Sequence, residues 1–333
     1  MKPVSLLLAA TVLVSIALGA TRAEDTAVPV TSRVIAQFAI GNDRKNFGAL
    51  EFIGGVTYSS TNPLLGAMSG IRFGEDRQTF LAILDTGHWL TGKVVRDREG
   101  RIEALSDVTV ASMMAEDGRA QMFKGLVDAE GLALSGDRVL VSFEQRHRID
   151  EYGGADFVAK PPVGSLDIPF DRSELRSNQG LEALAVAPAT SPLGMVPVVV
   201  AERSLDENGD LYAAVLEGPM RGEFRVRRQD PWDVTDAAFL PDGDLLLLER
   251  RFRLSDGVGM RIRRIAGEDI EPGAVVDGDV LIDADMSHQI DNMEGLDVVV
   301  MPDGDIRIIV VSDDNHSILQ RNLMLEFRLT NGD

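Results

Sequence analysis

The sequence predicts an all-β fold, a single β-propeller of five or six blades that is closed by pairing of N- and C-terminal strands. Three observations support this prediction. A unit of two strands around a tight turn recurs at a nearly constant spacing, the copies are strand patterns throughout, and the last strand is regular enough to pair with the first ones. A constant period in an all-strand chain is typical of a propeller, because one blade cannot bury its own faces alone.

The clearest copy of the unit lies near the C-terminus. It begins with Asn292-Met-Glu-Gly-Leu-Asp297, passes through a valine run to the turn Pro302-Asp-Gly-Asp305, and ends with the strand 306–311 and the segment Ser312-Asp-Asp-Asn-His316. In the turn, Pro presets φ, Asp caps its own backbone and Gly takes the position with positive φ. We therefore expect two antiparallel strands here, with acidic residues at their ends.

Four earlier segments repeat this order of strand, turn, strand and polar end. They cover residues 69–88, 130–147, 182–203 and 236–251. The starts of the five copies are 60, 52, 54 and 58 residues apart, and they lie at Gly70, Glu130, Glu182, Asp236 and Glu294. The interval from the last start around to the first is about 80 residues, long enough for a degenerate sixth blade. The blade count therefore stays open between five and six.

Strands at both ends of the chain could close the ring. Residues 34–40 and 50–58 have strand patterns. In the last strand, 323–329, the odd-numbered residues are all apolar and are expected to face inward, with Met324, Glu326 and Arg328 outward. Pairing of this strand with the N-terminal ones would remove the exposed edges of an open sheet.

The first 23 residues have the pattern of a secretory signal peptide. Lys2 precedes an apolar run from Val4 to Ala20, and Thr21-Arg-Ala23 fits a cleavage site with small residues. The run is short for a membrane span and no second one follows. We predict a signal peptide over residues 1–23 and one propeller domain over 24–333, a periplasmic or secreted monomer without membrane insertion after cleavage.

Composition excludes several classes of function. The chain carries a formal net charge of −20 and only 18 aromatic residues, so it would repel nucleic acid and offers few surfaces for stacking bases. It has no cysteine, which removes disulfides and thiol chemistry. It also has no Gly-x-Ser-x-Gly elbow and no His-Glu-x-x-His zinc motif. We expect no nucleic-acid partner and no serine hydrolase of the α/β type.

Two series of acidic residues recur at corresponding places of the units. One series opens the first strand and consists of Glu130, Glu182, Asp236 and Glu294. The other closes the next strand and consists of Asp85, Glu144, Glu202, Glu249 and Asp313. In an antiparallel pair the start of one strand lies beside the end of its partner, so both series are expected at one mouth of the propeller.

Such a gathering of carboxylates needs compensation. Two carboxylates about 5 Å apart repel by roughly 3 kcal/mol at an effective dielectric near 20, so protons, arginines or a metal must offset the charge. Oxygen ligands without cysteine favour a hard cation, and Ca²⁺ accepts irregular shells of about 6 to 8 oxygens. We expect Ca²⁺ here, and the predicted ligands are Glu130, Glu182, Asp236, Glu294 and Asp313. The alternative is that these acids are solvated turn residues.

Arginines and histidines accompany the second acidic series. Arg203 follows Glu202 directly and Arg321 lies a little beyond Asp313, and an arginine in such a place could pair internally or hold a phosphate in a bidentate fork. Three histidines each stand three residues after an acid, at His88, His147 and His316. A neutral imidazole there could ligate metal or shuttle protons, or it could be an ordinary polar residue leaving a strand.

The C-terminal unit carries a family resemblance. Four segments carry it, namely Asn292-Met-Glu-Gly-Leu-Asp297, Ser312-Asp-Asp-Asn315, Gln320-Arg321 and, further upstream, Gln179-Gly-Leu-Glu-Ala-Leu184. With them the chain resembles the phytase-like family described as having esterase-like activity of phytase. The resemblance extends over residues 48–329 and implies an exported, propeller-like protein whose repeated Glu and Asp form a phosphoesterase site. Ser69 and Gly70 stand where the other repeats open with an acid.

Together the pattern and the resemblance predict a divalent-metal-dependent phosphoesterase that acts on a small phosphorylated or other anionic ester. The predicted catalytic residues are Glu182, Glu294, Arg203, Arg321 and His147. Two alternatives remain at this stage. One is a non-catalytic propeller that binds a small ligand or a protein partner at the same mouth, and the other is a calcium-dependent lactonase-like hydrolase.

Overall fold

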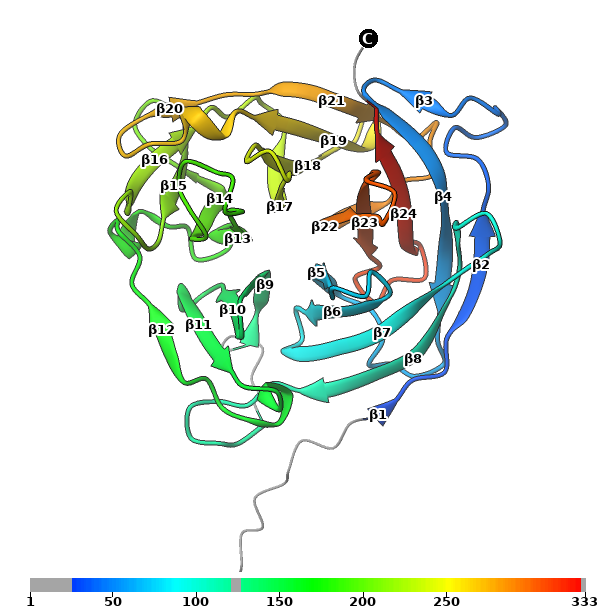
Figure 1. Cartoon of the computed structure of the whole chain (residues 1–333), viewed down its shortest axis with the longest axis horizontal. Helices are drawn as coiled ribbons and strands as arrows, with labels where there is room; N and C mark the ends of the chain where they lie inside the picture. The colour runs from blue at the N-terminus through cyan, green and yellow to red at the C-terminus, as the bar shows by residue number, and fades with distance from the viewer. Residues whose placement is uncertain (1–25, 121–126, 331–333) are drawn as a thin grey trace, which may run out of the picture.

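The computed structural model describes residues 26–120 and 127–330. Their strands form five sheets that stand as blades around a central axis, so the fold is a five-bladed β-propeller (Figure 1). The predicted all-β propeller is confirmed, and the blade count that the sequence left open is five. The predicted signal peptide, residues 1–23, lies outside the described residues.

Each blade is described from the central axis outward. Blade 1 contains β5 (Met68–Phe73), β6 (Thr79–Leu84), β7 (His88–Arg96), β8 (Ile102–Ser112) and β1 (Thr26–Ala27). Blade 2 contains β9 (Ala129–Ser135), β10 (Arg138–Phe143), β11 (Arg148–Gly153) and β12 (Gly164–Leu166). Blade 3 contains β13 (Leu181–Val186), β14 (Pro197–Leu205), β15 (Leu211–Val215), β16 (Gly222–Val226) and β20 (Val275–Val276).

The last two blades complete the ring. Blade 4 contains β17 (Asp233–Phe239), β18 (Leu245–Arg253), β19 (Gly257–Ile265) and β21 (Asp279–Ala284). Blade 5 contains β22 (Asn292–Val300), β23 (Ile306–Asp313), β24 (Asn322–Leu329), β4 (Leu50–Ser59) and β2 (Thr31–Ile35), with β3 (Asn46–Phe47) paired to β4. Short 3-10 helices lie in the connections at Phe157–Ala159, Arg172–Glu174 and Gly267–Asp269.

Blade 5 closes the ring with strands from both ends of the chain. β24 pairs antiparallel with β4 from Asn322↔Tyr58 to Leu329↔Leu50, and β4 pairs in turn with β2. The predicted closure is confirmed. The long interval between the last and first repeats is therefore used by these closing strands rather than by a sixth blade. A closed ring leaves only short outer edges exposed, which suits a chain without disulfides.

The core is divided among the five junctions between neighbouring blades. Five clusters of buried apolar residues each combine strands of two consecutive blades; for example, one unites Leu246 and Leu248 of β18 with Ile308 and Val310 of β23. Each blade is thus covered on both faces. Burial of apolar surface between blades, rather than inside one thick core, stabilises the chain.

This two-sided burial corrects the expected pattern of the last strand. Met324 and Glu326 were expected to face outward, but both are fully buried. Met324 belongs to the cluster shared with blade 1, whereas Leu323 and Leu325 belong to the cluster shared with blade 4. Glu326 is neutralised by Arg96, whose Nη1 lies 2.8 Å from Oε2. The alternation therefore sorts side chains between two junctions instead of between core and solvent.

No helix among residues 26–120 and 127–330 is long and apolar enough to cross a membrane.

Candidate functional site

The innermost strand of every blade carries a β-bulge at a corresponding place. In four blades the pairing with the next strand skips one residue, and in blade 2 the two residues Glu130 and Gly131 oppose the single residue Ser142. The bulged residues of blades 1 to 5 are Ser69, Glu130, Glu182, Thr235 and Glu294. A bulge redirects the side chain that it adds, and here it turns carboxylates toward the mouth of the propeller.

The end of the second strand of each blade lies beside these bulges. The residues at this place are Asp85, Glu144, Glu202, Arg250 and Asp313, and the backbone ties each to the residue two positions before the bulge. Four blades thus supply a carboxylate and blade 4 supplies a guanidinium. Three acids of the first predicted series and four of the second line one cavity at this mouth. For these residues, the expectation that the two series meet is confirmed.

The two sets of residues enclose an acid cavity of about 340 Å³. Eight carboxylic side chains and a single arginine are among the described residues that line it; these are Asp85, Asp128, Glu130, Glu144, Glu182, Glu202, Glu294, Asp313 and Arg250. With all carboxyls ionised the lining would carry a charge of −7. A density of this kind in a partly enclosed space strongly attracts cations.

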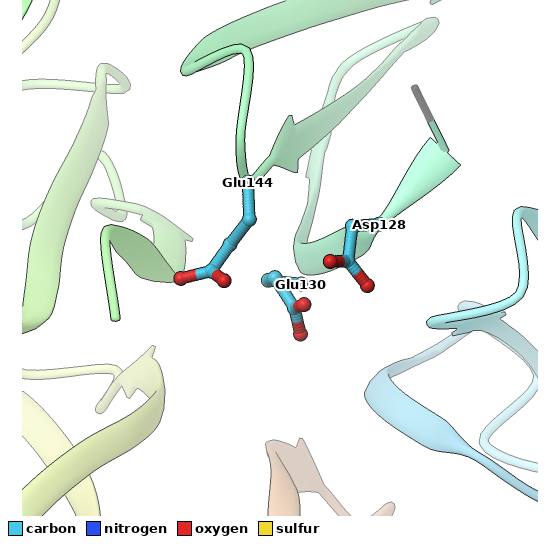
Figure 2. A group of neighbouring side chains, drawn as sticks. All are labelled: Asp128, Glu130 and Glu144. Carbon is cyan, nitrogen blue, oxygen red and sulfur yellow. The ribbon is translucent and has the colours of Figure 1, made fainter. Parts of the chain in front are cut away.

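Two groups of three carboxylates are close enough to share an ion. Asp128, Glu130 and Glu144, drawn in Figure 2, lie side by side, and one oxygen of each is within 4.8 Å of the others. Glu144, Glu182 and Glu202 form a second such group. Glu144 belongs to both. The backbone amides of Gln179 and Gly180 donate to its Oε1 at 2.5 and 2.6 Å, which holds the shared carboxylate in place.

Burial and mutual repulsion raise the pKa of several of these acids. Desolvation raises the pKa of Glu130 and Glu182 well above the usual value, and neighbouring carboxylates add to both shifts. Burial likewise raises the pKa of Glu294 to about 8 and that of Glu202 to about 7, and Arg250 partly opposes both of these shifts. Burial also raises the pKa of Asp313 to about 6. Without a bound cation, the cavity therefore takes up protons near neutral pH.

Asp236 lies apart from this cavity. The bulged residue of blade 4 is Thr235, so Asp236 falls one place further along, where the other blades have glycine or alanine. Its carboxylate accepts hydrogen bonds from Arg72 at 2.9 and 3.0 Å and from the backbone amides of Leu296 and Ala237. Asp236 is thus the buried partner of Arg72 in an ion pair, and backbone amides also bind its carboxylate. The predicted role of Asp236 as a metal ligand gains no geometric support.

Arg72 fills the middle of the propeller below the acid cavity. Its guanidinium reaches from β5 to Asp236 of blade 4 and also donates to the carbonyl oxygens of Leu184 in blade 3 and Leu296 in blade 5. One side chain therefore links four blades, and it is buried with its partner. This buried polar crosslink therefore fixes the relative positions of the innermost strands.

Glu249 shows the same one-residue displacement on the second strand of blade 4. Its carboxylate pairs with Arg261 and, at 2.7 Å, with Arg263, and all three side chains are buried within the blade. Because successive side chains of a strand point to opposite faces, the next residue, Arg250, is the one that reaches the acid cavity. Nη1 of Arg250 lies 2.8 Å from Glu294 and Nη2 lies 3.3 Å from Glu202.

The predicted catalytic arginines lie beside the acid cavity rather than in it. Arg203 and Arg321 line a second, larger cavity of about 850 Å³ that shares Gln179, Glu202 and Arg250 with the first. Arg321 is held by Gln289 at 2.8 Å and by the carbonyl oxygen of Ile290 at 2.9 Å. The side chain of Arg203 forms an ion pair with Asp233 at 3.5 Å.

His147 lies behind the acid cavity. The imidazole is buried against Gly180, where an added Cβ would come within 2.3 Å of its Cε1 atom. Burial lowers its pKa, so the ring is neutral at pH 7. It therefore packs against the backbone whose amide binds Glu144, and a direct role in proton transfer remains a prediction.

The comparisons with known proteins place this chain in a family. The model of the phytase-like family, described as esterase-like activity of phytase, matches residues 63–316, about three quarters of the sequence. The chain belongs to this phytase-like family. The residues that carried the resemblance in the sequence lie within or beside the matched range, so the predicted family is confirmed.

Other comparisons concern shape. No curated protein matches the chain. Among solved structures, an endo-arabinase from Bacteroides thetaiotaomicron VPI-5482 has 13% identity and a TM-score of 0.49, with 81% of this chain and 96% of that chain covered. A PQQ-bound aldose sugar dehydrogenase from Streptomyces coelicolor has 11% identity and a TM-score of 0.41, with 91% and 99% covered. The assignment of the phytase-like family rests on the sequence match alone.

The phytase-like propeller also brings unpredicted residues to the cavity. Asp128 joins Glu130 and Glu144, and Arg250 takes the place expected for Glu249. A signal for Asp128 was present, because a polar residue stands two positions before the acid in both units, Asp128 before Glu130 and Asn292 before Glu294. In blade 5 the corresponding residue, Asn292, binds both Arg250 and Glu294.

Proposed function

We propose that this phytase-like protein is an exported, divalent-metal-dependent phosphoesterase that hydrolyses a phosphomonoester or phosphodiester at the acid cavity. One observation carries the proposal: two groups of three carboxylates share Glu144 at the mouth of a propeller whose family is described by an esterase-like activity. The proposed protein is a periplasmic or secreted monomer, and its substrate is a small anionic ester rather than a nucleic acid.

The donor set fits a hard divalent cation. All ligand atoms in the two groups are carboxylate oxygens, the type that Ca²⁺ prefers at distances of about 2.3–2.6 Å. In each group the three oxygens lie within 4.8 Å of one another, close enough for one such ion to contact all three. Asp128, Glu130 and Glu144 would hold an ion in one group and Glu144, Glu182 and Glu202 in the other, with Ca²⁺ proposed as its identity.

A bound divalent cation would polarise the phosphoryl oxygens and lower the pKa of a water molecule in the site. The protein's own groups supply the rest of the chemistry. Glu182 and Glu294 line the acid cavity, and we assign them the removal of a proton from the attacking water; Arg203, which lines the adjoining cavity, would pair with an anionic oxygen of the ester. The water oxygen bonds to phosphorus as the bond from phosphorus to the alcohol oxygen breaks. The proton taken from the water passes to the released alcohol oxygen, which restores the carboxylate.

Hydrolysis of 4-nitrophenyl phosphate and bis(4-nitrophenyl) phosphate by the purified protein tests this proposal. We expect release of nitrophenol that a chelator abolishes and that Ca²⁺ restores, and we expect Glu182→Gln to lower kcat by at least about 100-fold. Glu268→Gln, at an exposed position on a 3-10 helix, serves as the matched control and should leave the rate unchanged. No chelator-sensitive release from either ester would overturn the proposal.

A lactone panel distinguishes the related hydrolase. Chelator-sensitive opening of a lactone without hydrolysis of either phosphate ester would show the calcium-dependent lactonase instead. Divalent binding without turnover of any ester would favour the non-catalytic propeller.

A further inference from the structure

A groove runs from the acid cavity over blades 4 and 5. It is the cavity of about 850 Å³ that shares Gln179, Glu202 and Arg250 with the acid cavity, so the two spaces adjoin. Its volume falls within the range of about 300–1,000 Å³ that is usual for small-molecule sites. A molecule held in the groove could therefore place one end among the carboxylates.

Exposed apolar side chains line this groove. Phe252 is 71% exposed, Met286 57% and Leu319 87%, and they come from the end of β18, the segment after β21 and the connection between β23 and β24. Three separate segments of two blades thus direct apolar surface into one groove of a chain with a net charge of −20. Apolar groups gathered at a cavity, rather than scattered singly, indicate a binding surface.

The charge of the groove differs sharply from that of the acid cavity. Four arginines and three acids are among the described residues that line it, which gives +1 when all are ionised, against −7 for the acid cavity. Most of these arginines are engaged: Arg250 binds Glu294, Arg251 binds Asp256, and Arg321 binds Gln289. Arg203 is held more loosely, by an ion pair of 3.5 Å with Asp233. The groove can therefore complement one anionic group but not a highly charged polyanion.

We propose that the groove selects esters with a single anionic group and an apolar alcohol, such as an aryl or long alkyl phosphate. The anionic group lies between Arg203 and the acid cavity, and the apolar alcohol lies against Phe252, Met286 and Leu319. This assignment rests on the proposed hydrolysis for the position of the ester bond. It excludes a polyphosphorylated compound as the preferred substrate, because each added phosphate would lie near the eight carboxylic side chains of the acid cavity, where Arg250 is the single arginine among the described lining residues.

Kinetics with three esters in the presence of Ca²⁺ test the selection. We expect KM for 2-naphthyl phosphate to be at least about tenfold below that for methyl phosphate, and inositol hexakisphosphate to be the poorest of the three. The double variant Phe252→Ser/Met286→Gln should raise KM for 2-naphthyl phosphate about tenfold, which brings it close to the KM for methyl phosphate. Met195→Gln, at a methionine outside the groove that is 71% exposed, should change none of these values.

Binding of 2-naphthylphosphonate, an analogue that cannot be hydrolysed, separates this inference from the proposed function. If no ester is hydrolysed but the phosphonate binds and the double variant loses that binding, the groove assignment stands and the hydrolase fails. If esters are hydrolysed but the double variant changes neither KM nor phosphonate binding, the hydrolase stands and the groove assignment is overturned. Preference for inositol hexakisphosphate would also overturn it.

Discussion

Nη1 of Arg250 lies 2.8 Å from Oε1 of Glu294, and this pair joins blade 4 to blade 5 at the mouth of the propeller. Arg250 also reaches Glu202 of blade 3, and it is the single cation among the described residues around the acid cavity. It occupies the strand position at which the other four blades have a carboxylate. The guanidinium therefore compensates part of the negative charge, and the remainder is available to a metal ion.

Replacement of Arg250 by glutamine should separate charge compensation by the guanidinium from charge compensation by a metal ion. Because Glu202 and Glu294 would lose their partner, we expect the metal-free variant to lose about 3 kcal/mol of unfolding free energy. The cavity would then be more negative, so Ca²⁺ should raise the melting temperature of the variant by more than that of the wild type. Calorimetric scans with chelator and with Ca²⁺ measure both effects.

Arg101→Gln is the matched control for this experiment. Arg101 forms exposed ion pairs with Asp97 and Glu99, and their loss should change stability by less than about 1 kcal/mol. If Ca²⁺ raised the melting temperature of Arg250→Gln by less than that of the wild type, the proposed division of charge compensation between Arg250 and the metal ion would be contradicted.

Asp236→Asn tests the polar crosslink at the centre of the ring. The substitution keeps the size of the side chain but leaves the buried guanidinium of Arg72 without a counter-charge, so we expect a loss of about 3–5 kcal/mol in denaturant unfolding. Ca²⁺ affinity should stay unchanged, because Asp236 is bound to Arg72 and to two backbone amides. A loss of Ca²⁺ affinity with unchanged stability would instead restore Asp236 as a metal ligand.

The contrast between Asp236 and Glu182 shows what the sequence could predict. The turns and the alternating strand patterns were sufficient to predict the propeller, its closure and most of the acidic mouth. The bulges were not predictable from the pattern, and a bulge shifts by one residue which side chain reaches the cavity. Asp236 and Glu249 were therefore expected beside Glu182, whereas the neighbouring residues Thr235 and Arg250 hold the corresponding positions.

The sequence also could not predict that the acid cavity and the groove are separate. Arg203 and Arg321 follow acidic residues in the chain, but their side chains line the groove and not the acid cavity. Phe252, Met286 and Leu319 belong to loops and strand ends without a shared motif, so only the packing of blades 4 and 5 brings them together.

The pH dependence of stability should reveal the raised pKa values of the cavity. Glu294, with a pKa of about 8, Glu202, at about 7, and Asp313, at about 6, bind protons more tightly in the folded state than in the unfolded chain. This contribution to stability is fully present below the unfolded pKa near 4 and is lost as pH rises through the folded values. Between pH 5 and 8 the melting temperature of the metal-free protein should therefore fall.

Saturating Ca²⁺ should flatten this dependence, because the ion replaces the protons as the compensating charge. Thermal unfolding at several pH values, with chelator and with Ca²⁺, provides the measurement. A metal-free protein whose melting temperature rises steadily from pH 5 to 8 would contradict the raised pKa values.

Calorimetric titration of Ca²⁺ into chelator-treated protein tests most directly whether the acid cavity is a metal site. We expect saturable binding to the wild type and at least about tenfold weaker binding to Glu144→Gln, because Glu144 belongs to both groups of carboxylates. Glu207→Gln, on an exposed turn, should bind as the wild type does. The absence of saturable binding to the wild type, or equal affinity in Glu144→Gln, would contradict the assignment of this cavity as a metal site.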